Sequence, residues 1–172
     1  MTRTKWTERK FSFDFPEGWM SNILERLRGT GARLNELISG LSETDLSQKP
    51  DGKWSIKEHI GHLSDLEELH EGRIDDFIEG KNTLRAADMS NTKTYDSHHN
   101  GREINNLLND FRKNRTRLTF RLEHLNDEVQ TFKSLHPRLQ VMMRPVDMAY
   151  FTAEHDDHHL ASIRELVNTF RK

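Results

Sequence analysis

The chain has 172 residues, 33% hydrophobic and 31% charged, a length and balance that suit one domain of ordinary size. It has no run of about eighteen apolar residues, so the sequence predicts no transmembrane helix. The formal net charge is −2 and there are no cysteines, which argues against a broad nucleic-acid-binding surface and excludes disulfides, a catalytic thiol and zinc–thiolate sites.

Two stretches carry local positive charge. The first, MTRTKWTERK, is followed by no apolar segment, so the sequence predicts no secretory signal peptide. With the absence of cysteine, this favours a cytoplasmic protein without a membrane partner. The second, RKNRTR at 112–117, is interpreted as a solvated helix face, and we expect no nucleic-acid partner.

Apolar residues recur at helical spacing in four segments. The first runs over about residues 19–41 and is interrupted by Gly29 and Gly31, which can kink it. A connector follows, in which the sequence at 42–45 resembles a helix N-cap and predicts one short turn.

The second segment covers about residues 55–78, with Ser55 as its N-cap and Glu58 as the capping-box partner. Residues 81–100 are polar and aperiodic, so they are interpreted as a long loop. A loop of this length in a compact domain often covers a binding site or contributes to one.

The third segment runs over about residues 102–125, and a second connector follows that is β-permissive at its end but too short for a sheet. The fourth begins near Pro145, which suits a first helical position, and continues to about residue 170. These patterns predict an all-α protein, a four-helix bundle with long connectors after the second and third helices. We assign residues 19–172 to this single domain and residues 1–18 to an N-terminal extension.

Three histidines fall within five residues of the fourth segment, in the stretch YFTAEHDDHHLASI. Since each residue turns an α-helix by about 100°, His155 and His159 lie on one side of the helix, in the middle of its apolar stripe. Two imidazoles at this spacing can bind one metal ion. The alternative is buried histidines hydrogen-bonded to neighbouring groups, and spacing alone leaves the two interpretations about equally favoured.

A third ligand would come from another helix. The candidates on the second segment are His59, His62 and His70, and the helical geometry makes His62 plausible without deciding among them. His98 and His99 in the long loop are expected to be exposed rather than part of a site.

The stretches GKWSIKEHIGHLSDLEELH, HPRL and AYFTAEHDDHHLASI together resemble the DinB/YfiT-like superfamily of metal-binding four-helix bundles. The resemblance extends over about residues 19–170. It implies a divalent metal, zinc or nickel, held by His62, His155 and His159, with His158 as a neighbour rather than a ligand. It also implies a homodimer, and a metal-dependent hydrolase or a thiol S-transferase that uses a low-molecular-weight thiol of the bacillithiol type.

Three imidazoles leave a divalent ion its full charge and an open position. Such an ion can act as a Lewis acid, lower the pKa of bound water toward about 7, or hold a thiolate. The chain has no cysteine, so a thiol would arrive on a small-molecule substrate. The alternative functions are a metal-binding or stress-response bundle without catalysis, and a purely structural bundle that works through a partner.

No catalytic base is identified by the sequence. Acids within one turn of the proposed ligands could orient them, although each is more often a surface acid: Glu58, Asp65, Glu154 and Asp156. Arg73, on the same side of its helix as His62, could bind an anionic substrate group, but a salt bridge is the favoured interpretation. Trp54 and Tyr150 are interpreted as structural anchors.

Overall fold

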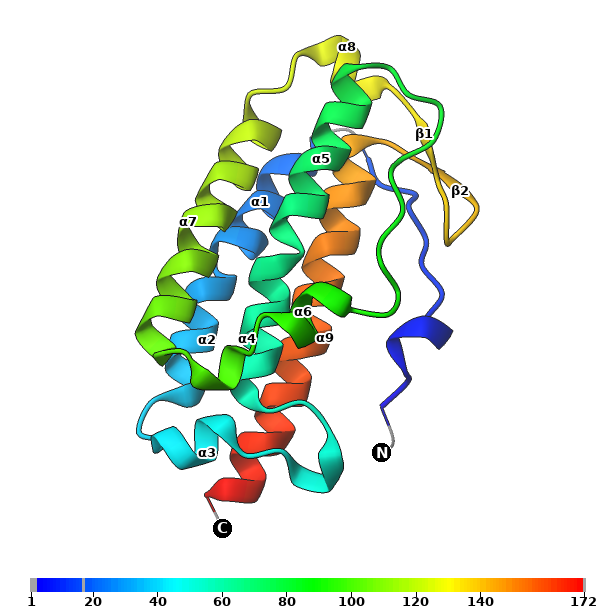
Figure 1. The fold of residues 1–172 in the computed structure, drawn as a ribbon. Coiled ribbons are helices and arrows are strands. Elements are labelled where there is room, and N and C mark those ends of the chain that lie inside the picture. The colour runs from blue at the N-terminus through cyan, green and yellow to red at the C-terminus, as the bar shows by residue number, and fades with distance from the viewer. Residues whose placement is uncertain (1–2, 17, 172) are drawn as a thin grey trace.

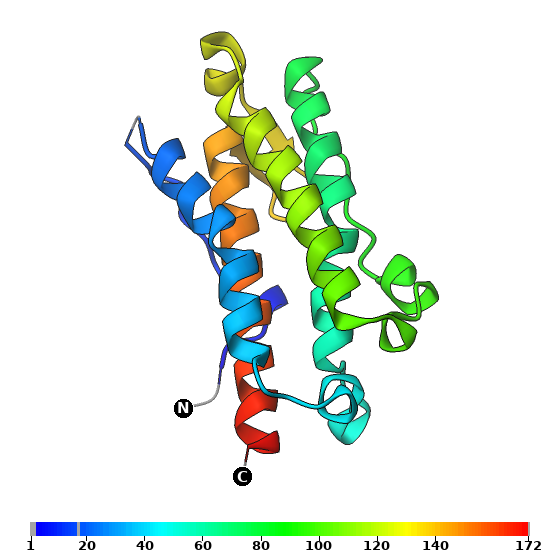
Figure 2. The same cartoon turned by 90° about the vertical axis from the view of Figure 1, so that its left-hand side faces the viewer.

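Four helical rods pack side by side in a computed structural model that describes residues 3–16 and 18–171. Within these residues the first and fourth rods run in one direction and the second and third in the other (Figure 1). The first rod lies beside the fourth, and the third lies beside the second (Figure 2). The predicted all-α four-helix bundle is therefore confirmed.

The first rod consists of α1 (Met20–Arg28) and α2 (Thr30–Ile38). They join at Gly29, which keeps helical dihedral angles and donates to the Glu25 carbonyl, so the rod is nearly continuous. After it, Ser42 and Asp45 form a capping box that starts α3 (Glu43–Ser47), the short turn that the sequence predicts. A 3₁₀ turn, η2 (Pro50–Gly52), leads to the second rod.

The second rod consists of α4 (Ile56–Asp65) and α5 (Glu67–Ile78), which meet at Leu66. Its start is fixed as expected, because the Ser55 hydroxyl accepts from the Glu58 amide and the Glu58 carboxylate accepts from the Ser55 amide. The capping box fixes the residue at which α4 begins.

The segment between the second and third rods returns along the length of the bundle, because these two rods run parallel (Figure 1). It is more ordered than the predicted loop at 81–100. It contains α6 (Thr92–Asp96) and a 3₁₀ turn, η3 (His99–Gly101), and the Leu84 side chain is buried. We refer to residues 81–103 as the crossover segment.

The third rod is α7 (Ile104–Glu123), and α8 (Asp127–Thr131) follows it. The next stretch forms an antiparallel hairpin of β1 (Ser134–His136) and β2 (Val141–Met143). The expectation that this connector is too short for a sheet was wrong: the hairpin is two-stranded, and Leu135 also bridges to Thr83 of the crossover segment.

The fourth rod is a single helix, α9 (Pro145–Phe170). Pro145 occupies its first turn as predicted, and the Asp147 carboxylate accepts from the Arg144 amide at 2.9 Å. Among the described residues no helix is long and apolar enough to cross a membrane.

A buried polar layer separates two apolar clusters of the core. One cluster is centred on Leu34, Phe111 and Ile163, and the other on Leu27, Leu118 and Ala153. Along each rod, a buried polar residue lies between the residues of one cluster and those of the other: Thr30, Glu67, Arg115 and Asp156. The interpretation of RKNRTR as a solvated face therefore fails at Arg115, which is only 3% exposed.

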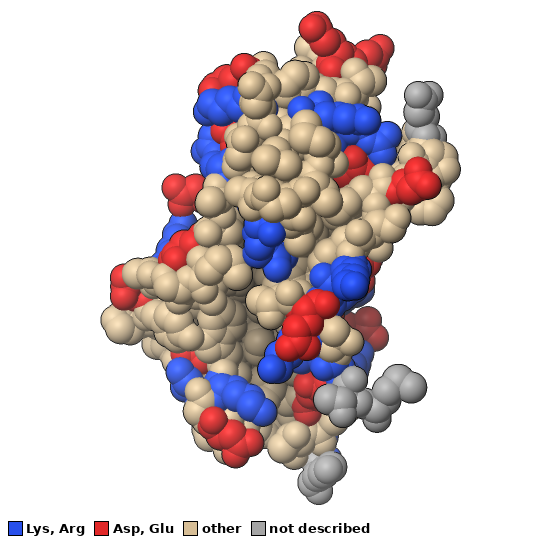
Figure 3. Space-filling model, turned by 90° about the vertical axis from the view of Figure 1, so that its right-hand side faces the viewer, with Lys and Arg blue, Asp and Glu red and all other residues tan. Residues whose placement is uncertain are grey.

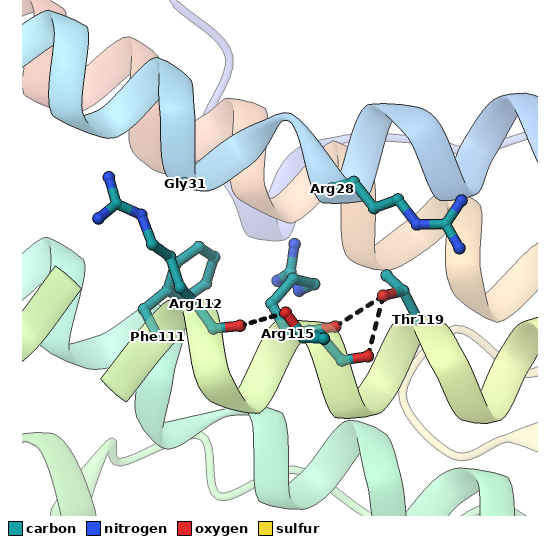
Figure 4. Close-up of a pocket in the computed structure, with 7 residues that line it drawn as sticks. Arg28, Gly31, Phe111, Arg112, Arg115 and Thr119 are labelled. Carbon is teal, nitrogen blue, oxygen red and sulfur yellow. Dashed lines mark hydrogen bonds between the residues drawn. The ribbon is translucent and has the colours of Figure 1, made fainter. Parts of the chain in front are cut away.

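The polar layer is held by one buried guanidinium. Arg115 donates to Glu67 at 2.6 Å and also to Asp156, whose carboxylate accepts a further bond from Thr30 at 2.7 Å. Figure 4 shows Arg115 directed from α7 towards the first rod. The charges pair inside the core, so the layer is an internal ion network rather than a ligand site.

The described residues before α1 run along α9 and include a 3₁₀ turn, η1 (Trp6–Glu8). The Trp6 ring lies 5.1 Å from the Phe11 ring and 5.0 Å from the Phe151 ring. Arg9 pairs with Glu154. The division of the chain at residue 18 stays a prediction, and residues 1–2, 17 and 172 lie outside the described residues.

Candidate metal centre

His62 of α4 meets His155 and His159 of α9 between the second and fourth rods. Each can offer one ring nitrogen, and the three atoms lie within 4.8 Å of one another. The Nε2 atoms of His155 and His159 are 3.1 Å apart. We refer to these residues as the three-histidine cluster.

Hydrogen bonds on its far side fix the ring of His62. Its Nδ1 lies 3.0 Å from Thr94 Oγ1, and Thr94 in turn donates to the Asp65 carboxylate at 3.0 Å. His99 Nε2 contacts the same carboxylate oxygen at 2.8 Å. Because the Thr94 hydroxyl gives its proton to Asp65, it accepts from His62 Nδ1–H, which leaves the Nε2 lone pair free.

His159 is supported in a similar way by His59. The two Nδ1 atoms are 2.8 Å apart, so His159 can donate from Nδ1 and keep its Nε2 lone pair. Supporting bonds of this kind orient imidazole ligands in metal sites. In His155, by contrast, Nδ1 is buried without a hydrogen-bond partner among the described residues.

The three candidates that the sequence left open on the second rod are now separated. His62 enters the cluster, His59 lies behind His159, and His70 is buried beside Thr152 at 3.5 Å. The expectation of two exposed loop histidines holds for His98 and is wrong for His99, which is 2% exposed.

Burial keeps the cluster neutral. It lowers the pKa of His62 to about 4, against the opposing effect of the Asp65 charge. Burial also holds the pKa values of His155 and His159 well below the usual range. The charge of His62 lowers both pKa values further, and the charge of His155 lowers the pKa of His159. Near neutral pH all three are therefore unprotonated at one nitrogen, which is the form that binds metal ions.

Two tryptophans flank the cluster. The Trp54 ring lies 4.7 Å from the ring of His62 and stacks on His159 at 6.1 Å. From the other side, Trp6 contacts His155 at 4.9 Å. The Trp6 ring also lies 5.7 Å from His158, which stands outside the three-histidine group. Apolar walls of this kind limit the access of water.

Of the four acids named from the sequence, Asp65 is the one that reaches the cluster, through Thr94. Glu58 caps α4, Glu154 binds Arg9 and Arg26, and Asp156 binds Arg115. These three carboxylates have structural partners and are therefore not available as bases at the cluster.

A cavity of about 380 Å³ opens beside His62, between the second rod and the crossover segment. Asp65 and Thr94 belong to its lining, together with the apolar side chains of Leu66 and Leu69. A volume of this size suits a small molecule. The predicted role of residues 81–100 in covering a site is thus consistent with the position of this cavity.

A second cavity, of about 90 Å³, lies between the first rod and α7. Figure 4 shows Gly31 on one side and Phe111 and Arg112 on the other, and no histidine lines it. We do not connect it with the three-histidine cluster.

Charge on the hairpin side of the molecule is mixed in sign. In Figure 3, Lys and Arg side chains stand next to Asp and Glu around a broad uncharged area, without a continuous basic surface on this face. This face therefore lacks the concentrated positive charge that nucleic-acid binding requires.

Comparisons with known proteins identify the family and the fold of the chain. Residues 26–163 match the family model of the DinB superfamily. The chain belongs to this superfamily. The match includes His62, His155 and His159, so the whole three-histidine cluster lies in the part of the chain shared with the DinB superfamily.

The fold is also that of a solved structure. The chain matches YfiT from Bacillus subtilis with a TM-score of 0.79 and 19% identity, over 95% of this chain and 94% of that one. That protein is described as a probable metal-dependent hydrolase with an unusual four-helix bundle topology. No curated protein sequence gave a significant match.

Within this DinB fold, sequence reasoning missed the residues that support the ligands. Thr94 and His99 come from a segment interpreted as an exposed loop, and Trp6 from the N-terminal extension. No periodic pattern marks them, since their partners are distant in the sequence. For His59, the signal was its place three residues before His62 on the same helix.

Proposed function

We propose that His62, His155 and His159 hold a divalent metal ion, and that the protein is a metal-dependent enzyme acting on a small molecule. The main support is the orientation of the rings. Thr94 contacts Nδ1 of His62, and His59 contacts Nδ1 of His159. One ring nitrogen from each of the three histidines lies within 4.8 Å of the others. Three neutral imidazoles form a donor set that zinc and nickel favour, so the residues fit such an ion.

The alternative of purely hydrogen-bonded core histidines is less consistent with this arrangement. The 3.1 Å contact between Nε2 of His155 and Nε2 of His159 can share only one proton. His62 directs another lone pair to the same place, with no donor from the protein to receive it. A cation satisfies all three lone pairs at once.

An ion in this site would supply Lewis-acid activation of a carbonyl or phosphoryl oxygen, of water or of a thiol. The chain itself supplies orientation. Asp65 and Thr94 hold the ring of His62, and both also line the adjacent cavity, where a substrate would bind. Trp54 and Trp6 shield the cluster from bulk solvent.

Two reactions are compatible with the site, hydrolysis and thiol S-transfer. The structural similarity to a protein described as a probable metal-dependent hydrolase supports the first. For the second, a co-substrate of the bacillithiol type would bring the thiol, because the chain has no cysteine. A cytoplasmic location, a homodimer, and zinc or nickel as the ion belong to the same proposal.

The test is elemental analysis of untagged protein purified without added metal. We expect about one divalent ion per chain, lost in both His62→Ala and His155→Ala. His124→Ala is the matched control, since His124 is exposed and, among the described residues, contacts Phe120 through one hydrogen bond and ring stacking. No uptake of zinc or nickel by the wild type would refute the proposal.

A protein that binds the ion can still lack catalysis, as in a stress-response bundle. Hydrolase and thiol-transfer assays with the metal found, compared between wild type and His155→Ala, distinguish these functions. Turnover by the wild type but not by His155→Ala identifies an enzyme that depends on the metal site. Stoichiometric metal without turnover of any substrate favours the non-catalytic bundle.

A further inference from the structure

Arg73 is an almost fully buried cation that makes no ion pair with a described acid. Burial lowers the pKa of Arg73, although the charge of the nearby Asp76 raises it. Arg73 is 2% exposed, and its Nε donates to the Arg85 carbonyl at 3.2 Å. The nearby Asp76 carboxylate is bound instead by Arg85 and Lys81. The favoured interpretation of Arg73 as a salt-bridge residue was therefore wrong. A buried guanidinium without a carboxylate is costly unless an anion joins it.

A second guanidinium, that of Arg138, is close enough for its charge to lower the pKa of Arg73 further. It lies in the turn of the β1–β2 hairpin and makes no ion pair with a described residue. Its Cζ atom is 5.8 Å from the centre of the Trp6 ring and 5.6 Å from that of Phe151. Such stacking uses the faces of the guanidinium and leaves its in-plane N–H donors unused. One of them, at Nη2, is buried without a partner.

His136 adds a third donor. It is 2% exposed, and its Nδ1 accepts from the Leu139 amide at 3.2 Å, so its Nε2 carries the proton. That Nε2 is buried and has no acceptor among the described residues. Burial, followed by the charges of Arg73 and Arg138, lowers the pKa of His136 to about 4, so the ring is a neutral donor at neutral pH.

These groups lie next to the three-histidine cluster. The His136 ring is 5.2 Å from the Phe151 ring, which also contacts Arg138. Trp6, which covers Arg138, touches His155 at 4.9 Å. After burial and the neighbouring histidines, the Arg138 charge is a further cause of the low pKa of His155. One aromatic side chain, that of Trp6, thus lies between Arg138 and the proposed ligand His155.

We propose that Arg73, Arg138 and His136 form an oxyanion-binding subsite, which takes a carboxylate or phosphate group of the substrate while its reactive part lies at the three-histidine cluster. The role of this subsite in catalysis rests on the proposed function, whereas its ability to bind an oxyanion does not. Two guanidinium groups and one imidazole N–H, none of them in an ion pair with a described carboxylate, match the acceptors of an oxyanion. The substrate class is thereby narrowed to anionic small molecules.

The experiment is a calorimetric titration of metal-free protein with inorganic phosphate and, separately, with succinate. We expect binding of one anion per chain, weakened about tenfold or more in Arg138→Met, because a charge-assisted bond is lost. Arg112→Met is the matched control, since Arg112 is exposed and makes no ion pair with a described residue, and it should bind as the wild type does. Comparing phosphate with succinate shows which oxyanion is preferred.

A second measurement needs no variant. In ¹⁵N-edited NMR spectra of the wild type, the Nε2–H signal of His136 should shift on addition of phosphate. Equal affinity in the wild type and Arg138→Met, or an unmoved His136 signal, overturns the subsite. Because phosphate binding is measured on metal-free protein, the two proposals can fail separately. A wild type that binds phosphate but takes up no zinc refutes only the metal site. A wild type that takes up zinc but binds no phosphate refutes only the oxyanion subsite.

Discussion

Thr94 connects the crossover segment to a proposed ligand through one hydroxyl group. It accepts from His62 and donates to Asp65, so it holds the ring in one tautomer and one orientation. Residues with this role influence metal affinity although they never touch the ion. The importance of a buried threonine in a polar segment follows from its two partners rather than from its type.

We predict that Thr94→Val lowers zinc affinity by about 10- to 100-fold without changing the stoichiometry, because the variant keeps the shape but loses the hydrogen bonds. Competition with a fluorescent chelator measures this affinity. Thr116→Val is the control, since the exposed Thr116 hydroxyl bonds only the Arg112 carbonyl. Unchanged affinity in Thr94→Val would show that Thr94 does not orient His62.

Asp76 gives a pH-dependent contribution to stability. Burial opposes its ionisation, but hydrogen bonds from Arg85 and Lys81 outweigh that effect and lower its pKa to about 2. The pKa in the folded state is thus below its ordinary value of 3.8. The stabilisation is therefore present above about pH 4 and is lost as the pH falls towards about 2.

We predict that Asp76→Asn is less stable than the wild type near neutral pH, and that the difference shrinks as the pH falls from about 4 to about 2. Urea unfolding across this range measures it. Asp110→Asn, which removes an exposed salt bridge to Arg102, should show little difference at any pH. A difference independent of pH would mean that the Asp76 charge contributes nothing.

At this scale, sequence spacing predicts part of the candidate site. The i, i+4 pair His155 and His159 shares a helix face, so its convergence follows from helical geometry. The choice of His62 over His59 required the resemblance, because both lie close to the inner side of α4. Partners such as Thr94 and Trp6 depend on tertiary packing of distant segments, which no local pattern specifies.

Close packing between α4 and the crossover segment depends on Gly61. A Cβ atom at this position would lie 2.2 Å from Cγ of His99, so only glycine lets the two elements approach this closely. The approach places His99 against Asp65. The crossover segment can therefore pack against α4 because Gly61 has no side chain.

We predict that Gly61→Ala lowers the free energy of unfolding by about 1–3 kcal/mol, since the inflexible neighbour must move. Gly101→Ala, in the same region and with open space around its Cβ position, is the control. Urea denaturation of both variants tests this. Equal stability of Gly61→Ala and the wild type would show that His99 can relocate freely.

The N-terminal segment covers the cluster chiefly through Trp6. We predict that Trp6→Ala lowers the free energy of unfolding by roughly 1–2 kcal/mol, less than for a fully buried aromatic, and speeds the removal of zinc by a chelator. Trp19→Ala is the control, because that side chain is 47% exposed. Unchanged stability and release kinetics would show that the segment does not protect the site.

The elements themselves follow closely from the sequence where a physical signal marks them. The capping box at Ser55 and Glu58 and the proline at Pro145 fix two helix starts. The hairpin was missed because its strands have three residues each and depend on the bridge from Leu135 to Thr83. The turns α6 and η3 were missed for the same reason, since tertiary contacts select them.

Across the whole molecule, the polar layer ties all four rods together. Arg115 of α7 binds Glu67 of α5 and Asp156 of α9, and Asp156 binds Thr30 of α2. Without the guanidinium, Glu67 and Asp156 would repel each other. Burial raises the pKa of Glu67 to about 7, with a smaller contribution from the Asp156 charge, although Arg115 lowers this pKa. The layer therefore joins all four rods at one level of the bundle.

We predict that Arg115→Leu lowers the free energy of unfolding by about 3–5 kcal/mol, because two buried carboxylates lose their counter-charge. Guanidinium denaturation followed by circular dichroism measures it. Arg112→Leu, one turn earlier and exposed, should change stability by less than about 0.5 kcal/mol. A similar loss in both variants would argue that the side-chain volume rather than the buried charge matters.

α9 serves several partners from different sides of one uninterrupted helix. His155 and His159 face the cluster, Asp156 faces Arg115, and Asp157 faces Arg26 and Arg33. One inserted or deleted residue would rotate everything beyond it by about 100° and separate these groups from their partners together. Insertions and deletions in related sequences should therefore be absent from α9 and should occur in the turns between the rods.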